Sequence, residues 1–217
     1  MDFSCVPKEV SATAAGPMEP FLAAAIAAGY RFVGQVLFEP CGDGGFRLCH
    51  RDDQGAAGLQ VFHGADAAVE IAAADAEGNF RPLKTAPDLR RGWELEVGGL
   101  GELRLALDFL YPAALGNWRA ALRGENLSVP LSETLGRQTG MYRITAKLDS
   151  AEALGIAKSL CSAGCLRRIL WTVDGTPPRS TGICEAGEIP LLCTDACSLF
   201  LGEARRTVKS RAVNPAG

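Results

Sequence analysis

The sequence predicts an α+β protein, in which a small antiparallel sheet with helices is followed by a mostly helical domain. Residues 30–38 and 93–97 are rich in β-forming side chains, and the first run alternates with a period of about two. Residues 100–110 carry leucines at helical spacing. Residues 150–210 are dominated by runs with helical character, which places the helical part in the C-terminal half.

We expect the first domain to span residues 18–125. Its predicted helices cover residues 18–28 (ending at Gly29), 65–74, 100–110 (ended by Pro112) and 113–123. Its predicted strands cover residues 30–38, 45–50, 58–62 and 93–97, with a hairpin between the first two and a loop over 84–91.

The second predicted domain spans residues 126–210. Ser150 is a suitable N-cap for a helix, and Glu152 then lies in its first turn. Residues 165–171 are expected to continue or restart this helix. A Gly/Pro-rich loop over 174–188 precedes Pro190, which is expected to lead into a last helix over 192–209.

Composition excludes several function classes. The 217 residues carry a net charge of −3 with 22% charged residues, which gives no basic field for nucleic acid. The apolar segment 21–34 is interrupted by Arg31 and is too short to span a bilayer. The N-terminus lacks the pattern of a signal peptide, so we expect a cytoplasmic protein that binds neither nucleic acid nor membrane.

The cysteines are the strongest functional signal. There are eight, and the reducing cytosol argues against disulfides as their purpose. Cys161 and Cys165 form one C-x3-C pair, and Cys193 and Cys197 form a second after 27 intervening residues. On a helix this spacing puts both thiols on one face, about 5–6 Å apart at Cβ. Two facing pairs would supply the four thiolates that a cubane iron–sulfur cluster needs.

The surrounding residues suit an anionic cluster. Pro190 would place Cys193 in the first turn of a helix, where backbone N–H groups favour negative charge. Arg167 and Arg168 follow Cys165 and would offset that charge. An apolar shell is expected from Leu160, Leu166, Ile169, Leu170, Trp171, Leu191, Leu192, Leu199 and Phe200.

Spacing alone leaves two alternatives open. Structural zinc also takes four cysteines, although usually with tighter C-x2-C knuckles, and buried free thiols need no metal at all. Cys184 lies in the Gly/Pro-rich loop and is interpreted as a loop thiol, with replacement of one ligand as the alternative. Cys5, Cys41 and Cys49 lack partner spacing, so burial is the simplest interpretation for them.

Three runs of the sequence are similar to a module of a known family: LSVPLSETLGRQTGMYRI, LCSAGCLRRILW and IPLLCTDACSLFL. They resemble the 4Fe–4S module found C-terminal to some CbiX-type sirohydrochlorin cobaltochelatases. The upstream runs GGFRLCHRDDQGAAGLQVF, NFRPLKTAPDLRRGWEL and LALDFLYPAALGNW resemble the small stabilising domain that precedes this module. The resemblance implies that Cys161, Cys165, Cys193 and Cys197 are the cluster ligands and that Cys184 is not.

The multidomain relatives carry a chelatase domain ahead of these two domains, and nothing of that size precedes residue 20 here. The only histidines are His50 and His63, interpreted as ordinary strand and turn residues. We therefore expect a non-enzymatic redox or electron-transfer accessory to tetrapyrrole (cobalamin or siroheme) metal insertion, with a separate CbiX-type chelatase or a redox protein as partner. The alternatives are a non-redox structural cluster module and a four-cysteine zinc-binding interaction domain.

Overall fold

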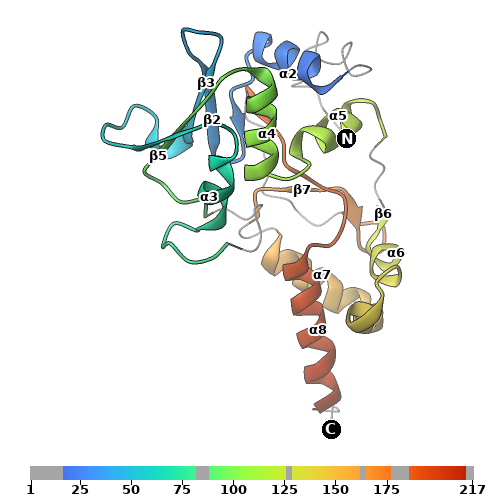
Figure 1. The fold of residues 1–217 in the computed structure, drawn as a ribbon. Coiled ribbons are helices and arrows are strands. Elements are labelled where there is room, and N and C mark those ends of the chain that lie inside the picture. Colours follow the sequence, from blue (N-terminus) through green and yellow to red (C-terminus); the bar gives the residue numbers. More distant parts are fainter. Residues whose placement is uncertain (1–16, 82–87, 126–128, 162–164, 177–185, 214–217) are drawn as a thin grey trace. The chain divides into compact units, whose positions relative to one another are not determined.

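The computed structural model describes residues 17–81, 88–125, 129–161, 165–176 and 186–213 (Figure 1). The chain groups into two compact units. The first runs to Glu125 and also takes in a later segment that ends at Leu191, and the second contains the rest. Both helices and a mixed sheet are present, so the α+β class is confirmed.

The first unit combines four α-helices with six strands among its described residues. The helices are α2 (Met18–Ala27), α3 (Ala67–Ala73), α4 (Leu100–Leu110) and α5 (Ala114–Leu122), with a 3-10 turn, η2 (Arg51–Asp53). The strands are β1 (Phe32–Val33), β2 (Val36–Pro40), β3 (Phe46–His50), β4 (Gln60–His63), β5 (Trp93–Val97) and β9 (Glu188–Ile189).

The six-stranded sheet has the order β4-β5-β3-β2-β1-β9. Its four central strands are antiparallel, and the predicted hairpin is confirmed by the β2–β3 register, in which Leu37 lies opposite Cys49. The predicted small antiparallel sheet forms this centre, and a parallel strand is added at each edge, β4 beside β5 and β9 beside β1. Both parallel pairings join segments far apart in sequence, which local patterns do not reveal.

Aromatic packing forms the centre of the first unit. The ring of Trp118 lies 4.9 Å from the rings of both Phe21 and Tyr30, between α2 and α5. Trp93, Leu95 and Val97 alternate inward along β5, as period-two patterning predicts.

The second unit is mostly helical. Its elements are β6 (Val129–Pro130), α6 (Leu131–Gly136), the 3-10 segment η3 (Gly140–Lys147), α7 (Ser150–Leu160), β7 (Arg168–Ile169), β8 (Trp171–Thr172), β10 (Leu192–Cys193) and α8 (Ser198–Val213). β10 pairs with β7 and β6 pairs with β8, both in parallel. The expectation of helix over 165–171 was therefore wrong, and the last helix begins at Ser198 rather than near residue 192.

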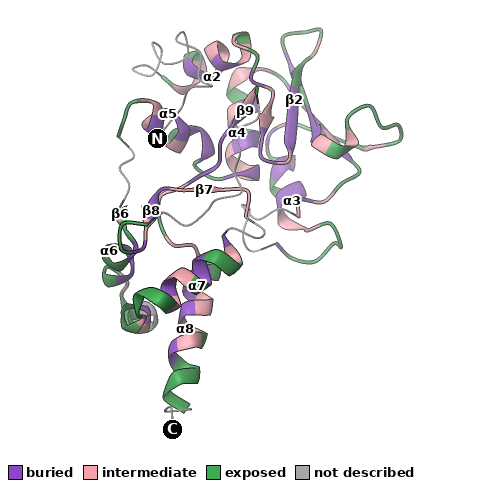
Figure 2. Ribbon diagram, turned by 180° about the vertical axis from the view of Figure 1, so that it is seen from behind, coloured by how far each residue is buried: buried purple, intermediate pink, exposed green. Residues whose placement is uncertain are grey.

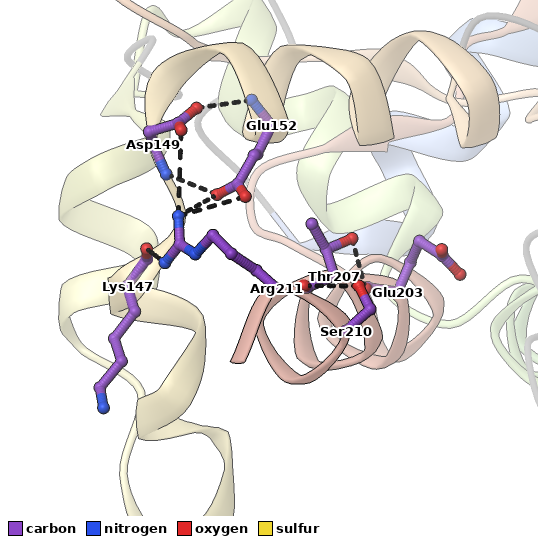
Figure 3. Close-up of polar contacts among 7 residues, drawn as sticks. All are labelled: Lys147, Asp149, Glu152, Glu203, Thr207, Ser210 and Arg211. Atoms are coloured by element: carbon purple, nitrogen blue, oxygen red, sulfur yellow. Dashed lines mark hydrogen bonds and ion pairs between the residues drawn. The ribbon is translucent and has the colours of Figure 1, made fainter. Parts of the chain in front are cut away.

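Helix α7 begins with a capping box (Figure 3). The Asp149 carboxylate accepts from Glu152 N at 2.8 Å, and Glu152 Oε2 accepts from Asp149 N at 3.0 Å. Ser150, predicted as the N-cap, is instead the first helical residue, because only Asp149 has a carboxylate three residues later to complete the box. Arg211 of α8 reaches Glu152 at 3.1 Å and the Lys147 carbonyl at 2.9 Å, which ties the two helices together.

Residues of α6, α7, β8 and α8 form the core of the second unit, and Figure 2 shows buried residues on both α7 and α8. It is formed by Leu131, Leu135, Ala153, Ile156, Ala157, Cys161, Trp171, Val173, Phe200, Leu201 and Ala204. Trp171 and Phe200 meet edge to face with centroids 5.4 Å apart. Across the described residues, no helix is both long and apolar enough to cross a membrane.

Candidate metal centre

Each of the four predicted ligands lies at or next to the end of a regular element. Cys161 caps the C-terminus of α7, where its N–H donates to Ala157 O at 2.8 Å. Cys165 lies in the irregular segment before β7, and Cys193 ends β10. Cys197 directly precedes α8, and its carbonyl accepts from Leu201 N at 2.9 Å.

This arrangement corrects the expected geometry of the two pairs. Neither pair lies on one face of a helix, and Cys193 lies in a strand rather than in a first helical turn. The helix N-terminus comes instead at Cys197, so the N–H groups that favour negative charge are near that thiol. Extended backbone replaces helix because β7 and β10 pair with each other, with Cys193 opposite Ile169.

The strand pairing brings the two cysteine segments together. Leu170 N donates to the Cys193 carbonyl at 2.9 Å, which fixes Cys193 beside the chain that begins just after Cys165. The Cys161 thiol interacts electrostatically with those of Cys165, Cys193 and Cys197. The four cysteines thus lie at the end of α7, before β7, on β10 and before α8, and Cys161 and Cys197 share one core cluster.

Burial dominates the acid–base behaviour of these thiols. Burial, and to a lesser extent the thiols of Cys165, Cys197 and Cys193, together raise the pKa of Cys161 to about 12. Burial also raises the pKa of Cys165 and of Cys193. Without a metal, these thiols therefore stay protonated at neutral pH, and binding a metal would release protons.

Arg167 opposes this trend. Its backbone N–H approaches the Cys165 sulfur, and its guanidinium charge lowers the pKa of both Cys165 and Cys193 against the effect of burial. The guanidinium is held by a hydrogen bond from Nη1 to the Leu192 carbonyl at 3.2 Å. The Cys193 thiol itself donates to the Asp195 carbonyl at 2.9 Å.

The donor set fits an iron–sulfur cluster, because four thiols are the soft ligands that such clusters take. Among the described residues, no three His, Cys, Asp or Glu side chains converge closely enough to hold a metal ion. The described residues therefore form no closed coordination shell, and the ligand assignment stays a prediction. Cys5 and Cys184 lie outside the described residues.

The other described cysteines and both histidines belong to the first unit. Cys49 is buried in β3, which raises the pKa of its thiol to about 11, and Cys41 is half-buried. His50 is 1% exposed, and its Nδ1 accepts from Asp52 N at 3.1 Å. His63 is exposed and pairs with Glu96 at 3.2 Å.

Two family models match the chain, one in its N-terminal part and one in its C-terminal part. Residues 123–206 match the model of a 4Fe-4S iron-sulfur cluster binding domain. Residues 21–122 match the model of the DR2241 stabilising domain. The chain thus contains a 4Fe–4S cluster-binding domain, and a 4Fe–4S cluster is its cofactor, which favours the cluster over zinc.

One solved structure resembles most of the chain. It is DR2241 from Deinococcus radiodurans, described as a multi-domain protein with structural similarity to chelatases and with two additional novel domains. The TM-score is 0.72 at 31% identity, over 87% of this chain and 41% of that chain. The chain thus spans less than half of the length of DR2241. No curated protein matches the sequence.

Trp171 is the residue near the site whose polar role the sequence did not reveal. The pattern gave it only a place in the apolar shell, and it is indeed 1% exposed in the core. Its indole N–H lies close enough to Cys193 to lower the pKa of that thiol. The alternation of Ile169 and Trp171 across the consecutive short strands β7 and β8 would have signalled this, had the segment been recognised as extended.

Proposed function

We propose that this protein is an iron–sulfur accessory in which Cys161, Cys165, Cys193 and Cys197 hold the cluster and electron transfer is its task. The observation that supports the proposal is the pairing of β7 with β10, which sets Cys193 beside the chain that follows Cys165 although the two cysteines lie far apart in sequence. Four cysteine ligands would leave no open iron position for a substrate. When bound, a 4Fe–4S cluster exchanges single electrons with a donor or acceptor.

The chain's own residues would support this role in three ways. The core around Trp171 and Phe200 excludes water from one side of the site. The charge of Arg167 offsets part of the negative charge of the thiolates. The N-terminus of α8 presents backbone N–H groups beside Cys197, which also favours negative charge.

We further propose that the electrons serve tetrapyrrole metal insertion, with a CbiX-type chelatase as partner. The chelatase-like character described for DR2241 supports this link. A cytoplasmic place of action is supported by the described cysteines, all of which are free thiols.

Anaerobic purification followed by iron, sulfide and zinc analysis tests the ligand set. Cys193→Ala should lose or degrade the cluster, whereas Cys184→Ala and Cys41→Ala should keep wild-type iron and sulfide content. Full cluster content in Cys193→Ala would overturn the ligand assignment.

Two further measurements test the role. Dithionite should bleach the visible absorption reversibly, and a cluster that cannot be reduced and reoxidised without loss would point to a purely structural module. Adding the reduced protein to a purified CbiX-type chelatase with sirohydrochlorin and cobalt should speed metal insertion. An unchanged rate with no detectable complex would remove the link to tetrapyrroles.

A further inference from the structure

The pairing of β7 with β10 sets which side chains lie beside Cys193. Ile169 is opposite Cys193 in this parallel pair. Trp171 lies two residues beyond Ile169 in the extended segment and shares its face. Arg167, in the bend before β7, is placed on the other side of Ile169 by its hydrogen bond to the carbonyl of Leu192, the residue before Cys193. Cys193 is therefore bracketed by one cationic side chain and one indole.

Both flanking side chains carry a buried N–H group that lacks an acceptor. Among the described residues, Trp171 Nε1 and Arg167 Nε are inaccessible and have no partner at hydrogen-bond geometry. Such orphaned donors are rare in folded proteins, and an indole N–H can only donate. The Nη1 bond to the Leu192 carbonyl holds the Arg167 guanidinium in place, so its Nε is not free to turn toward solvent.

Orphaned donors alone do not define a site, since Trp118 Nε1 and His50 Nε2 of the first unit share this property. What distinguishes Trp171 and Arg167 is the sulfur beside them. Leu170, the neighbour of Trp171, donates its N–H to the Cys193 carbonyl at 2.9 Å, and Arg167 Nη1 donates to the carbonyl of Leu192, the residue before Cys193, at 3.2 Å. A negatively charged acceptor at this position would satisfy both donors.

We propose that Trp171 Nε1 and Arg167 Nε donate hydrogen bonds to sulfur on the Cys193 side of the cluster and thereby raise its reduction potential. This inference rests on the ligand assignment made above. Reduction adds one electron, supplied by a low-potential donor such as dithionite, and makes the cluster more negative without a bond being broken. Hydrogen bonds and positive charge at the sulfurs stabilise the reduced state more than the oxidised state.

Trp171→Phe tests the indole, because it keeps an aromatic ring in the core and removes only the donor and part of the ring. The potential is measured by dithionite titration followed by electron paramagnetic resonance. The reduction equilibrium should fall roughly tenfold, which is a shift of about 59 mV to lower potential for a one-electron couple. Trp118→Phe is the matched control, since it deletes an equally buried orphan N–H in the first unit and should leave the potential unchanged.

Arg167→Gln is the second variant and should shift the potential in the same direction. A third measurement needs no substitution. In wild-type protein carrying 15N-indole tryptophan, the reduced cluster should show a 15N hyperfine coupling. An unchanged potential in both variants, an equal shift in Trp118→Phe, or the absence of the 15N coupling would each overturn the proposal.

The outcomes also separate this inference from the proposal on which it rests. If Cys193→Ala keeps its full cluster, the ligand assignment fails, whatever the potentials are. If Cys193→Ala loses the cluster and Trp171→Phe keeps both cluster and potential, only the role of the donors is refuted. The midpoint does not depend on how much protein carries the cluster, so partial loading of a variant leaves the test valid.

Discussion

Replacing Asp149 by alanine should destabilise α7, the helix that ends at Cys161. Asp149 accepts from Glu152 N at 2.8 Å, and this cap satisfies one of the free N–H groups of α7. Loss of such a cap costs about 1 kcal/mol. The ion pair with Arg211 adds little, because its atoms are 4.0 Å apart and the Asp149 side chain is 60% exposed.

Hydrogen exchange of peptides from α7, followed by mass spectrometry, measures the effect. A loss of about 1 kcal/mol should make these amides exchange about fivefold faster. Asp149→Asn keeps a capping oxygen and removes the charge, so it should exchange like wild type. Equal acceleration in Asp149→Asn and Asp149→Ala would refute the reasoning, because the charge rather than the cap would then hold the helix.

Other predictions concern packing, backbone and pH. Phe200→Ala removes a fully buried ring from the core of the second unit and should cost about 3–5 kcal/mol in urea unfolding; a loss below about 1 kcal/mol would contradict this. Gly187→Ala should destabilise by at least about 2 kcal/mol, because φ is +80° and an added Cβ would lie 2.8 Å from the Gly29 carbonyl oxygen. Gly155→Ala, exposed in α7 with open space around it, should instead stabilise by about 0.5–1 kcal/mol, and the same sign for both glycine variants would refute the argument. In the apoprotein, folding raises the pKa of Cys161 from 9.0 to about 12 and so favours the neutral thiol. That stabilisation is complete below pH 9 and is lost between about pH 9 and 12, by at most about 1.4 kcal/mol per pH unit; Cys161→Ala should flatten this fall in urea midpoints, and a midpoint that rises with pH would contradict it.

The first unit was largely predictable because its signals are local. The helices α4 and α5 follow leucine spacing and stop near Pro112 and Gly124, and β5 alternates inward and outward. A four-cysteine metal site could also be predicted, since the two C-x3-C pairs are visible in the sequence. What spacing could not supply was the choice between iron–sulfur and zinc, because both take four thiolates.

The backbone around the cysteines was predicted wrongly for a physical reason. Residues 165–171 form a short, mostly apolar segment interrupted by two arginines, and such a segment fits a helix or a strand equally well. Pairing of β7 with β10, more than twenty residues further along the chain, stabilises the extended conformation. The true N-cap of α7 was recoverable, since Asp149 and Glu152 form the reciprocal pattern of a capping box, whereas Ser150 has Ala153 three residues later.

Because strand β9 belongs to the sheet of the first unit but follows most of the second unit in sequence, neither unit can be cut out as one continuous segment. The polypeptide chain leaves the first unit after Glu125 and returns to it to form β9, which pairs with β1. It enters the second unit again after Leu191. A fragment cut at Glu125 would expose the edge of β1 to pairing with other chains, and the remainder would carry a strand without its partner. Recombination that moved the cluster-binding half alone into another protein would therefore damage both products, so the two domains are expected to be inherited together.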